Sequence, residues 1–263
     1  MSLPVRTAAH PWHWPPIAMC KAGGVLIFDE DRASGSPFVE RVWRSHSEAA
    51  GWFVSIAESR AEIVVARYRG QVTVVVRGPE TRATRVPYPP DAEWLGIRFK
   101  PGVTVVPQPA RTLVDRKVIL PPASGGSFLL NGSAWQVPGF DDADTFAQSL
   151  VREDMLVLDP AVPAALHGDR SGSSLRTLQR RFLRATGLTQ SMTRQIEQAR
   201  YVVLLLQGGV PTPRAAQQAG YFDHPHLTRS LRRFTGHTPA QLLDGERAGQ
   251  LSFLYKTEPF ARP

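Results

Sequence analysis

The residues between Gly220 and Pro239, GYFDHPHLTRSLRRFTGHTP, combine basic and ring-bearing side chains around a Gly-led turn. They include three His, three Arg and two Phe. Guanidinium groups donate hydrogen bonds to phosphate oxygens, and an Arg can pair with two acceptors of a guanine at once. The segment is therefore either a solvated basic helix or a surface that contacts a polyanion.

The same pattern occurs a second time, earlier in the chain. Residues 178–189 (LQRRFLRATGLT) align with residues 227–238 (LTRSLRRFTGHT) at a spacing of 49 residues, with six identities in twelve positions. The identities keep Arg, Thr and Gly in register. Internal similarity of this kind indicates two copies of one structural unit.

Each copy is predicted to consist of two short helices joined by a sharp turn. In the second copy, helices over 213–219 and 224–234 flank the turn. Gly220 permits the left-handed backbone that such a turn needs, and Asp223 can cap the second helix. The second helix of each copy would carry its basic side chains outward.

The first copy has less room for its leading helix. A helix over 175–185 follows the N-cap residue Ser174, but only residues 162–167 are available for the helix before it, in a segment (159–172) that holds two Pro. We therefore expect this unit to bind its target more weakly. A longer helix over 193–207 joins the two copies. The core of this part is predicted from helical spacing to contain Leu178, Phe182, Ile196, Val203, Leu227 and Leu231.

Residues 170–243 resemble the C-terminal DNA-binding domain of AraC/XylS-type transcription regulators. The resemblance rests on SLRTLQRRFLRATG (174–187), RQIEQARYVVLLL (194–206) and AGYFDHPHLTRSLRRFTGHTPAQL (219–242), and covers about a quarter of the chain. It implies an all-α domain with two helix-turn-helix units, sequence-specific binding of duplex DNA, and control of transcription.

The resemblance also implies roles for individual residues. The base-contacting positions fall on Arg176, Gln179, Arg180, His224, His226 and Arg229. The phosphate-contacting positions fall on Thr228, Arg232 and Arg233, which would add affinity without sequence information. The alternative for each of these Arg residues is a solvated helix face.

The distribution of charge agrees with a polyanion-binding C-terminal part. Residues 1–159 hold 17 basic and 17 acidic residues, whereas residues 160–250 hold 12 Arg and 5 acidic residues. Such asymmetry is typical of a nucleic-acid-binding module attached to another domain.

The N-terminal part is predicted to be an antiparallel β-barrel or sandwich, which makes the fold class two-domain α+β. Short β-branched or aromatic runs are separated by Gly, Pro or charged residues at hairpin spacing. They lie at 25–28, 52–57, 62–67, 71–76, 81–86 and 94–99. A helical period over 141–158 predicts that this part ends on a helix. WLGIRFKPGV (94–103) resembles a signature in one branch of the cupin-like sensor domains of these regulators.

Aromatic residues of the β-rich part could line an apolar pocket for an unknown small-molecule effector, the alternative being an ordinary core. They are Trp43, Trp52, Tyr68, Trp94 and Phe99. We expect no catalytic residues, no metal and no cofactor. There is no His between residues 47 and 166, Cys20 is the single Cys, and no nucleophile elbow, P-loop or dinucleotide fingerprint occurs. His10 and His13 lie in a Pro-rich arm.

These observations divide the chain into a β-rich sensing and dimerisation domain (1–139), a helix and linker (140–169), the DNA-binding domain (170–247) and a tail (248–263). The leading hypothesis is an effector-responsive transcription regulator. Its expected partner is an operator DNA, and RNA polymerase and a second copy of the chain are further candidate partners. Its expected location is cytoplasmic and nucleoid-associated. No apolar run is long enough to span a membrane. The alternatives are a DNA-tethered β-domain enzyme and a protein-interaction module with a basic helical face.

Overall fold

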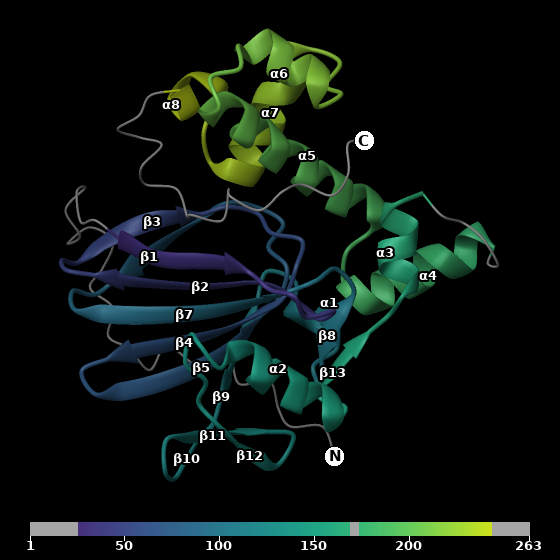
Figure 1. Ribbon diagram of the computed structural model, residues 1–263. Coiled ribbons are helices and arrows are strands. Elements are labelled where there is room, and N and C mark those ends of the chain that lie inside the picture. Colours follow the sequence, from purple (N-terminus) through teal and green to yellow (C-terminus); the bar gives the residue numbers. More distant parts are fainter. Residues whose placement is uncertain (1–25, 169–173, 244–263) are drawn as a thin grey trace.

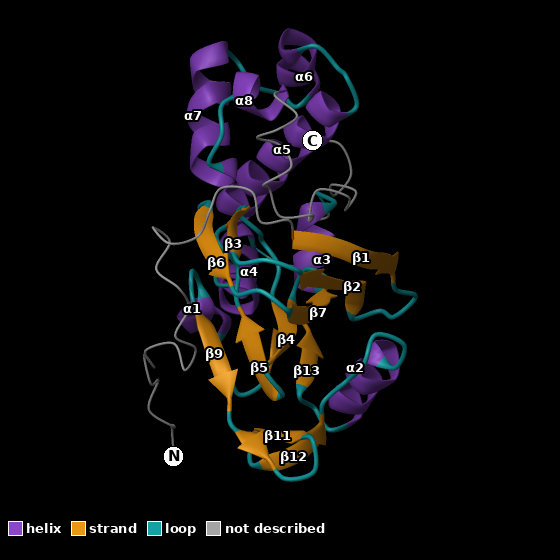
Figure 2. Ribbon diagram, turned by 90° about the vertical axis from the view of Figure 1, so that its left-hand side faces the viewer, coloured by secondary structure: helices purple, strands orange, loops and turns teal. Residues whose placement is uncertain are grey.

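The computed structural model describes residues 26–168 and 174–243 (Figure 1). The predictions for the Pro-rich arm, for Cys20 and for the tail lie outside the described residues. The chain forms a β-rich N-terminal part and a helical C-terminal part that sits over one end of it (Figure 2). None of the helices in the described ranges is both long and apolar enough to cross a membrane.

An antiparallel six-stranded sheet forms the centre of the N-terminal part, in the order β1-β2-β7-β4-β5-β9. Its strands are β1 (Leu26–Ala33), β2 (Val39–Ser47), β7 (Ala92–Phe99), β4 (Glu62–Tyr68), β5 (Gln71–Arg77) and β9 (Lys117–Leu120). Both β1 and β9 are edge strands in this order, so the described residues form an open, sandwich-like arrangement and no closed barrel.

The two faces of this sheet have different neighbours because side chains alternate along a strand. In β4, Ile63 and Val65 belong to the main hydrophobic core, whereas Val64 and Ala66 line a cavity on the other face. The core face is covered by α2 (Ala143–Arg152), and the cavity face also carries residues of β3 (Gly51–Ser55) and β6 (Thr84–Tyr88), which pair with each other.

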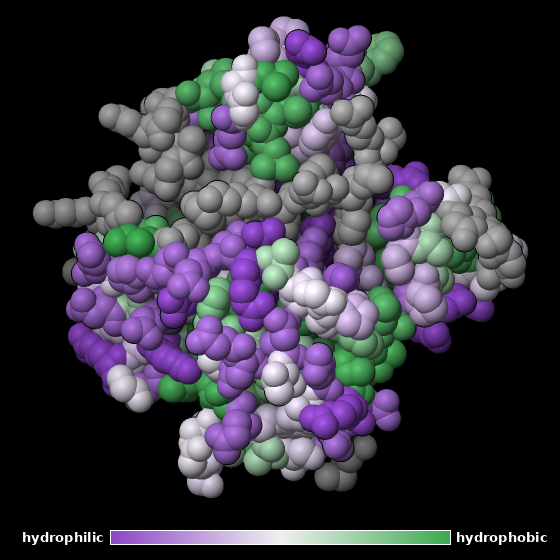
Figure 3. Space-filling model, viewed as in Figure 1, coloured by the Kyte–Doolittle hydropathy of each residue, from purple (hydrophilic) through white to green (hydrophobic). Residues whose placement is uncertain are grey.

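Smaller elements complete the N-terminal part. They are β8 (Val103–Val105) paired with β13 (Leu156–Leu158), α1 (Ala110–Leu113), and the three-stranded sheet of β10 (Pro122–Ala123), β11 (Ser127–Leu130) and β12 (Ser133–Gln136). On the face turned to the viewer in Figure 3, hydrophilic side chains predominate over this part.

The helix predicted over 141–158 is shorter in the structure. It ends at Arg152, and Asp154 has a φ of 57°, a left-handed conformation that a continuing helix does not allow. Residues 156–158 then form β13, which pairs antiparallel with β8. The β-rich part therefore extends beyond residue 139. Strand β2, for which no run was predicted, is an interior strand of the six-stranded sheet, between β1 and β7.

The helical part contains the elements predicted from the repeat. They are α3 (Ala161–Leu166), α4 (Leu175–Thr186), α5 (Gln190–Gln207), α6 (Thr212–Gln218) and α7 (His224–Thr235). A short α8 (Pro239–Leu243), which was not predicted, follows them. The residues predicted as its core are all buried, from 7% exposed for Leu178 down to 0% for Leu227.

Candidate nucleic-acid interface

The second unit consists of α6, a tight turn and α7. Gly220 has a φ of 75°, and the neighbouring carbonyl of Ala219 accepts a 2.6 Å hydrogen bond from the amide of Gln198 on α5. The Asp223 carboxylate accepts a hydrogen bond of 2.6 Å from the backbone N–H of His226 and caps α7. These bonds fix the angle at which α7 leaves the turn.

The hydroxyl of Tyr221 further ties the turn to α7, because it lies 2.7 Å from the hydroxyl of Ser230 in the buried interior. Burial raises the pKa of Tyr221 to about 12, and the bond to Ser230 opposes this shift. Tyr221 therefore remains neutral at physiological pH, as a buried structural residue.

The two units match in detail at the ends of their second helices. Thr186 donates to the carbonyl of Phe182 and accepts from the N–H of Leu188, and Thr235 makes the equivalent bonds to Leu231 and His237. Gly187 and Gly236 follow, with φ values of 74° and 76°. The 49-residue sequence repeat is therefore also a repeat of backbone geometry.

The structure exposes most of the residues that were predicted to contact DNA. Those on α4 are Arg176, Gln179 and Arg180; those on α7 are His224, His226, Arg229, Arg232 and Arg233. Each set shares its helix with buried Leu and Phe residues on the opposite side. The side chains needed for groove and backbone contacts are thus available on both helices.

Thr228 differs from the other predicted contacts. It is half-buried, and its hydroxyl oxygen is shielded from solvent and has no hydrogen-bond partner. A phosphate contact through this hydroxyl requires a rotation of the side chain.

Most Arg residues of α4 and α7 carry charge that no carboxylate among the described residues neutralises. None of the described acidic side chains forms an ion pair with an exposed Arg of α4 or α7; these are Arg176, Arg180, Arg184, Arg229, Arg232 and Arg233. By contrast, Arg181 on the inner side of α4 pairs with Asp159 at 2.6 Å. The unpaired guanidinium groups form two basic surfaces suited to phosphate.

Helix α5 holds the two units apart. Figure 1 shows α4 near one end of α5 and α7 near the other. Its 18 residues give a length of about 27 Å, while successive major grooves lie about 34 Å apart on one face of a duplex. The length of this bridge is therefore comparable to, and somewhat shorter than, the spacing of adjacent grooves.

The second helices of the two units, α4 and α7, are called the reading helices below, and both end against the N-terminal part. A Cβ added at Gly187 would lie 2.7 Å from the Ala110 carbonyl oxygen, and one added at Gly236 would lie 3.3 Å from Val54. In addition, the N–H groups of Ala57 and Ala83 donate to the carbonyls of Phe234 and Arg233 at 2.7 and 2.9 Å. The N-terminal part therefore contacts the C-terminal end of both reading helices.

A buried cluster of charges joins α5 to the N-terminal part. Glu197 accepts hydrogen bonds from Arg60 at 2.9 Å and from Ser59 at 2.7 Å, and Arg200 pairs with Glu58 at 2.8 Å. Burial opposes ionisation of Glu58, but the guanidinium groups of Arg200, Arg60 and Arg98 outweigh it and hold the pKa of Glu58 well below its ordinary value. This cluster was not predicted from the sequence.

The predicted pocket aromatics separate into two groups. Trp43 and Trp94 line the cavity of the N-terminal part. The other three lie elsewhere: Phe99 is fully buried in the main core, Arg69 stacks on Tyr68 at the end of β4, and Arg85 stacks on Trp52. Within residues 26–168 and 174–243, no three His, Cys, Asp or Glu side chains are grouped to hold a metal ion.

Comparison with known proteins is informative for the helical part. Residues 168–245 match the protein family described as a helix-turn-helix domain. Over 94 residues the chain is 34% identical to the HTH-type transcriptional regulator RipA of Corynebacterium glutamicum. This similarity covers 35% of the chain and 28% of that relative's length. No solved structure is significantly similar to the chain. With its two matching units, α3–α4 and α6–α7, the C-terminal part of this chain is a helix-turn-helix domain of the AraC type.

Proposed function

We propose that this protein binds duplex DNA sequence-specifically through α4 and α7 and regulates transcription from nearby promoters. The observation that carries the proposal is the pair of matching helices, each with exposed Arg residues that have no carboxylate partner among the described residues. If these helices were only solvated surface helices, we would not expect the same arrangement and the same capping geometry to recur 49 residues later.

The proposed roles of the individual residues follow from the chemistry of their side chains. Arg180 and Arg229 occupy equivalent positions, and an Arg in the major groove can bond the O6 and N7 atoms of guanine. Arg176, Gln179, His224 and His226 complete the proposed base-contacting set. Arg232 and Arg233 would bind phosphates. The N-terminal part would respond to an effector and form dimers, and RNA polymerase would be the partner of DNA-bound protein at the nucleoid.

The experiment that tests this proposal is selection of binding sites from randomised duplex DNA by the full-length protein, in about 0.15 M salt to suppress non-specific phosphate binding. We expect a bipartite site with half-elements about one helical turn apart. Folded protein that selects no sequence would contradict the proposal.

Two variants separate base contacts from phosphate contacts on the selected site. Arg229→Ala should cost about 1–3 kcal/mol of binding free energy and relax specificity at one base pair of the site. Arg232→Ala should weaken binding to all sequences and lower the slope of log affinity against log salt concentration by about one. Arg152→Ala, which changes an exposed Arg on α2, outside the helix-turn-helix domain, is the matched control and should have no effect.

A further inference from the structure

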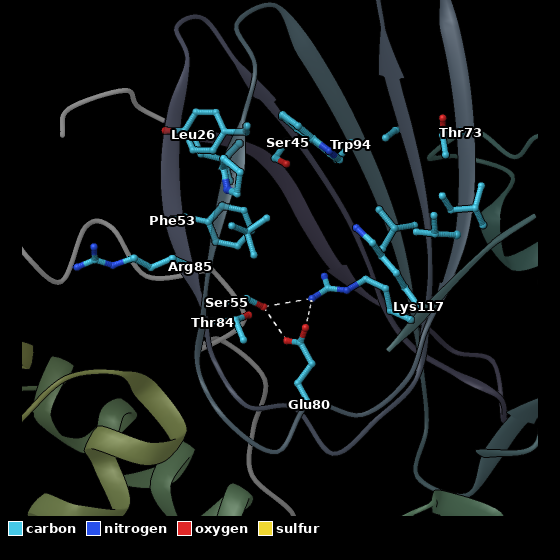
Figure 4. A pocket seen from close by; sticks show the side chains of 18 of the residues that line it. Leu26, Ser45, Phe53, Ser55, Thr73, Glu80, Thr84, Arg85, Trp94 and Lys117 are labelled. Carbon is cyan, nitrogen blue, oxygen red and sulfur yellow. Dashed lines mark hydrogen bonds and ion pairs between the residues drawn. The ribbon is translucent and has the colours of Figure 1, made fainter. Parts of the chain in front are cut away.

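A cavity of about 380 Å³ lies in the N-terminal part, on the face of the six-stranded sheet opposite its core (Figure 4). Residues of β4 and β5 line one side, and residues of β3 and β6 line the other. This volume lies within the range of small-molecule sites. The alternation of the strands explains the cavity, because Val64, Ala66 and Val75 face it while Ile63, Val65 and Val74 fill the core.

One region of the cavity is aromatic. Trp43, Phe53, Tyr88 and Trp94 line it, and Tyr88 packs edge-on against Trp94 with ring centroids 6.3 Å apart. Aromatic and aliphatic walls of this kind accommodate the apolar body of a ligand.

Another region is polar and contains basic side chains. Arg77 bonds Glu80 at 2.7 Å and Ser55 at 3.2 Å, and Lys117 extends into the same space in Figure 4. Four basic residues line the cavity (Arg77, Arg85, Arg116 and Lys117), against two acidic ones (Glu80 and Asp115). Both oxygens of Asp115 already accept bonds from Thr81, at 2.7 Å each. Arg77 also pairs with Glu62 at 2.9 Å, so four basic residues are set against three acidic ones, which leaves a small excess of positive charge beside an apolar wall.

We propose that this cavity binds a small carboxylate with an aromatic or similarly apolar body, whose carboxylate group contacts Lys117 and the Arg77–Glu80 pair. Burial lowers the pKa of Lys117 to about 8, Arg77 adds to this effect and Glu80 opposes it. A bound carboxylate places a negative charge beside the ammonium group and thereby favours its charged form.

The walls of the cavity are connected to the contacts that hold α7. Glu80, Thr84 and Arg85 line the cavity, and Ala83, which lies between them in the chain, donates its N–H to the carbonyl of Arg233. Glu80 also exchanges backbone hydrogen bonds with Glu58, the ion-pair partner of Arg200 on α5. A ligand that draws Arg77 away from Glu80 would shift this segment and, with it, the end of the reading helix.

The first helix-turn-helix unit is also connected to the walls of the cavity. Asp115, Arg116 and Lys117 line the cavity, and Val114, which precedes them, lies 2.7 Å from the position of a Cβ added at Gly187. The bonds from Thr81 to Asp115 join the two segments. Since both reading helices end on segments that also line the cavity, occupancy of the cavity changes the relative placement of the two DNA-binding units. This step rests on the proposed function.

The binding test uses calorimetric titration of the full-length protein without DNA at pH 7. The probes are benzoate, 3-phenylpropionate and 1-naphthoate, each compared with its neutral primary amide. We expect at least one carboxylate to bind at least about tenfold more tightly than its amide, as a charge-assisted contact requires. Amides that bind as tightly as the acids, or the absence of binding by all six compounds, would overturn the proposal.

Variants then assign the site. Lys117→Met should remove the preference for the acid over the amide, whereas Lys100→Met, whose side chain lies outside this cavity, should retain it. Ala66→Phe should fill the space and abolish binding of both compounds. Far-ultraviolet circular dichroism confirms that each variant is folded. Unchanged discrimination by Lys117→Met would refute the assigned carboxylate site.

The coupling test measures affinity for the selected DNA site with and without the carboxylate. We expect a change of at least about fivefold, which Ala66→Phe abolishes. If the protein selects a DNA site but no carboxylate binds or alters its affinity, this inference fails and the proposed function stands. If a carboxylate binds but no DNA site is selected, the regulator proposal fails and the ligand site remains.

Discussion

Arg200 of α5 and Glu58 of the N-terminal part form an ion pair of 2.8 Å in which both side chains are almost fully buried. The two residues are 142 positions apart in the chain. They connect the helix that separates the two DNA-binding units to the segment that pairs with the wall of the cavity. This pair is therefore part of the physical connection between the two halves of the molecule.

We predict that Arg200→Met destabilises the protein by about 3–5 kcal/mol, because it leaves Glu58 buried without its nearest partner from α5. Urea unfolding followed by circular dichroism measures the loss. Arg44→Met, which breaks the half-exposed pair with Glu30, is the control and should cost no more than about 1 kcal/mol. Equal losses for the two variants would show that the buried pair has no special role.

The same cluster predicts a dependence of stability on acidity. Since the pKa of Glu58 is lowered in the folded state, its ionised form stabilises the fold above the ordinary pKa of 4.5, and this stabilisation is lost as the pH falls below that value. Burial raises the pKa of Glu40, so ionisation of Glu40 lowers the stability of the fold and partly offsets the effect of Glu58. We expect Glu58→Gln to lose less stability than the wild type between pH 5 and pH 3, as measured by thermal unfolding over the pH series. A parallel loss in both proteins would contradict this assignment.

Gly187 offers a separate test of the contact between the first reading helix and the N-terminal part. Gly187→Ala introduces a Cβ 2.7 Å from the backbone oxygen of Ala110, whereas Gly70→Ala introduces one in open space at nearly the same φ, 73° against 74°. Left-handed backbone costs an Ala about 1–2 kcal/mol in either case. We expect the loss of stability to be clearly greater for Gly187→Ala, and similar losses would indicate that the two parts separate readily.

The helical part could be predicted well because its signals are local. Asp223 and Ser174 cap their helices as expected, and Gly187 and Gly236 end them in left-handed backbone. Strand β2 was missed because VERVWRSHS mixes charged residues with apolar ones, and only its pairing with β1 and β7 shows that it is an interior strand.

The buried ionic cluster could be identified only from the tertiary structure, because it joins three distant parts of the chain: residues 58–60, residue 98 and residues 197–200. One signal was present in α5. Glu197 and Arg200 lie on the same stripe as the core residues Ile196, Ala199 and Val203, and charges on a buried stripe indicate partners from another element. Likewise, whether an aromatic residue lines the cavity depends on which face of its strand it occupies. Trp94 and Phe99 both lie on β7, but Trp94 lines the cavity and Phe99 belongs to the main core.

The lowered pKa of Lys117 predicts proton uptake when a carboxylate binds in the cavity. Near pH 8.5 the ammonium form is partly lost, and a bound carboxylate restores it, so affinity should fall as the pH rises from 7 to 9. The other charged groups that line the cavity around it are Arg77, Arg85, Arg116, Glu80 and Asp115. Titration at pH 8.5 in phosphate and in Tris, which differ in ionisation enthalpy, measures the uptake. Lys117→Met should show none; proton uptake that persists in this variant would assign it to another group.

Phe222 provides a final prediction at the DNA interface. It lies in the turn just before α7, two residues from His224, and is 96% exposed. An exposed aromatic ring beside a reading helix can contact a thymine methyl group or the sugar of the adjacent nucleotide. We expect Phe222→Ala to weaken binding to the selected site severalfold without changing the free energy of unfolding, because the ring contributes no buried area to the fold. Fluorescence anisotropy with the selected duplex measures the first quantity and urea unfolding the second. Leu243→Ala, which removes an exposed apolar side chain after α7, is the control; if both variants bind DNA like the wild type, Phe222 has no part in the interface.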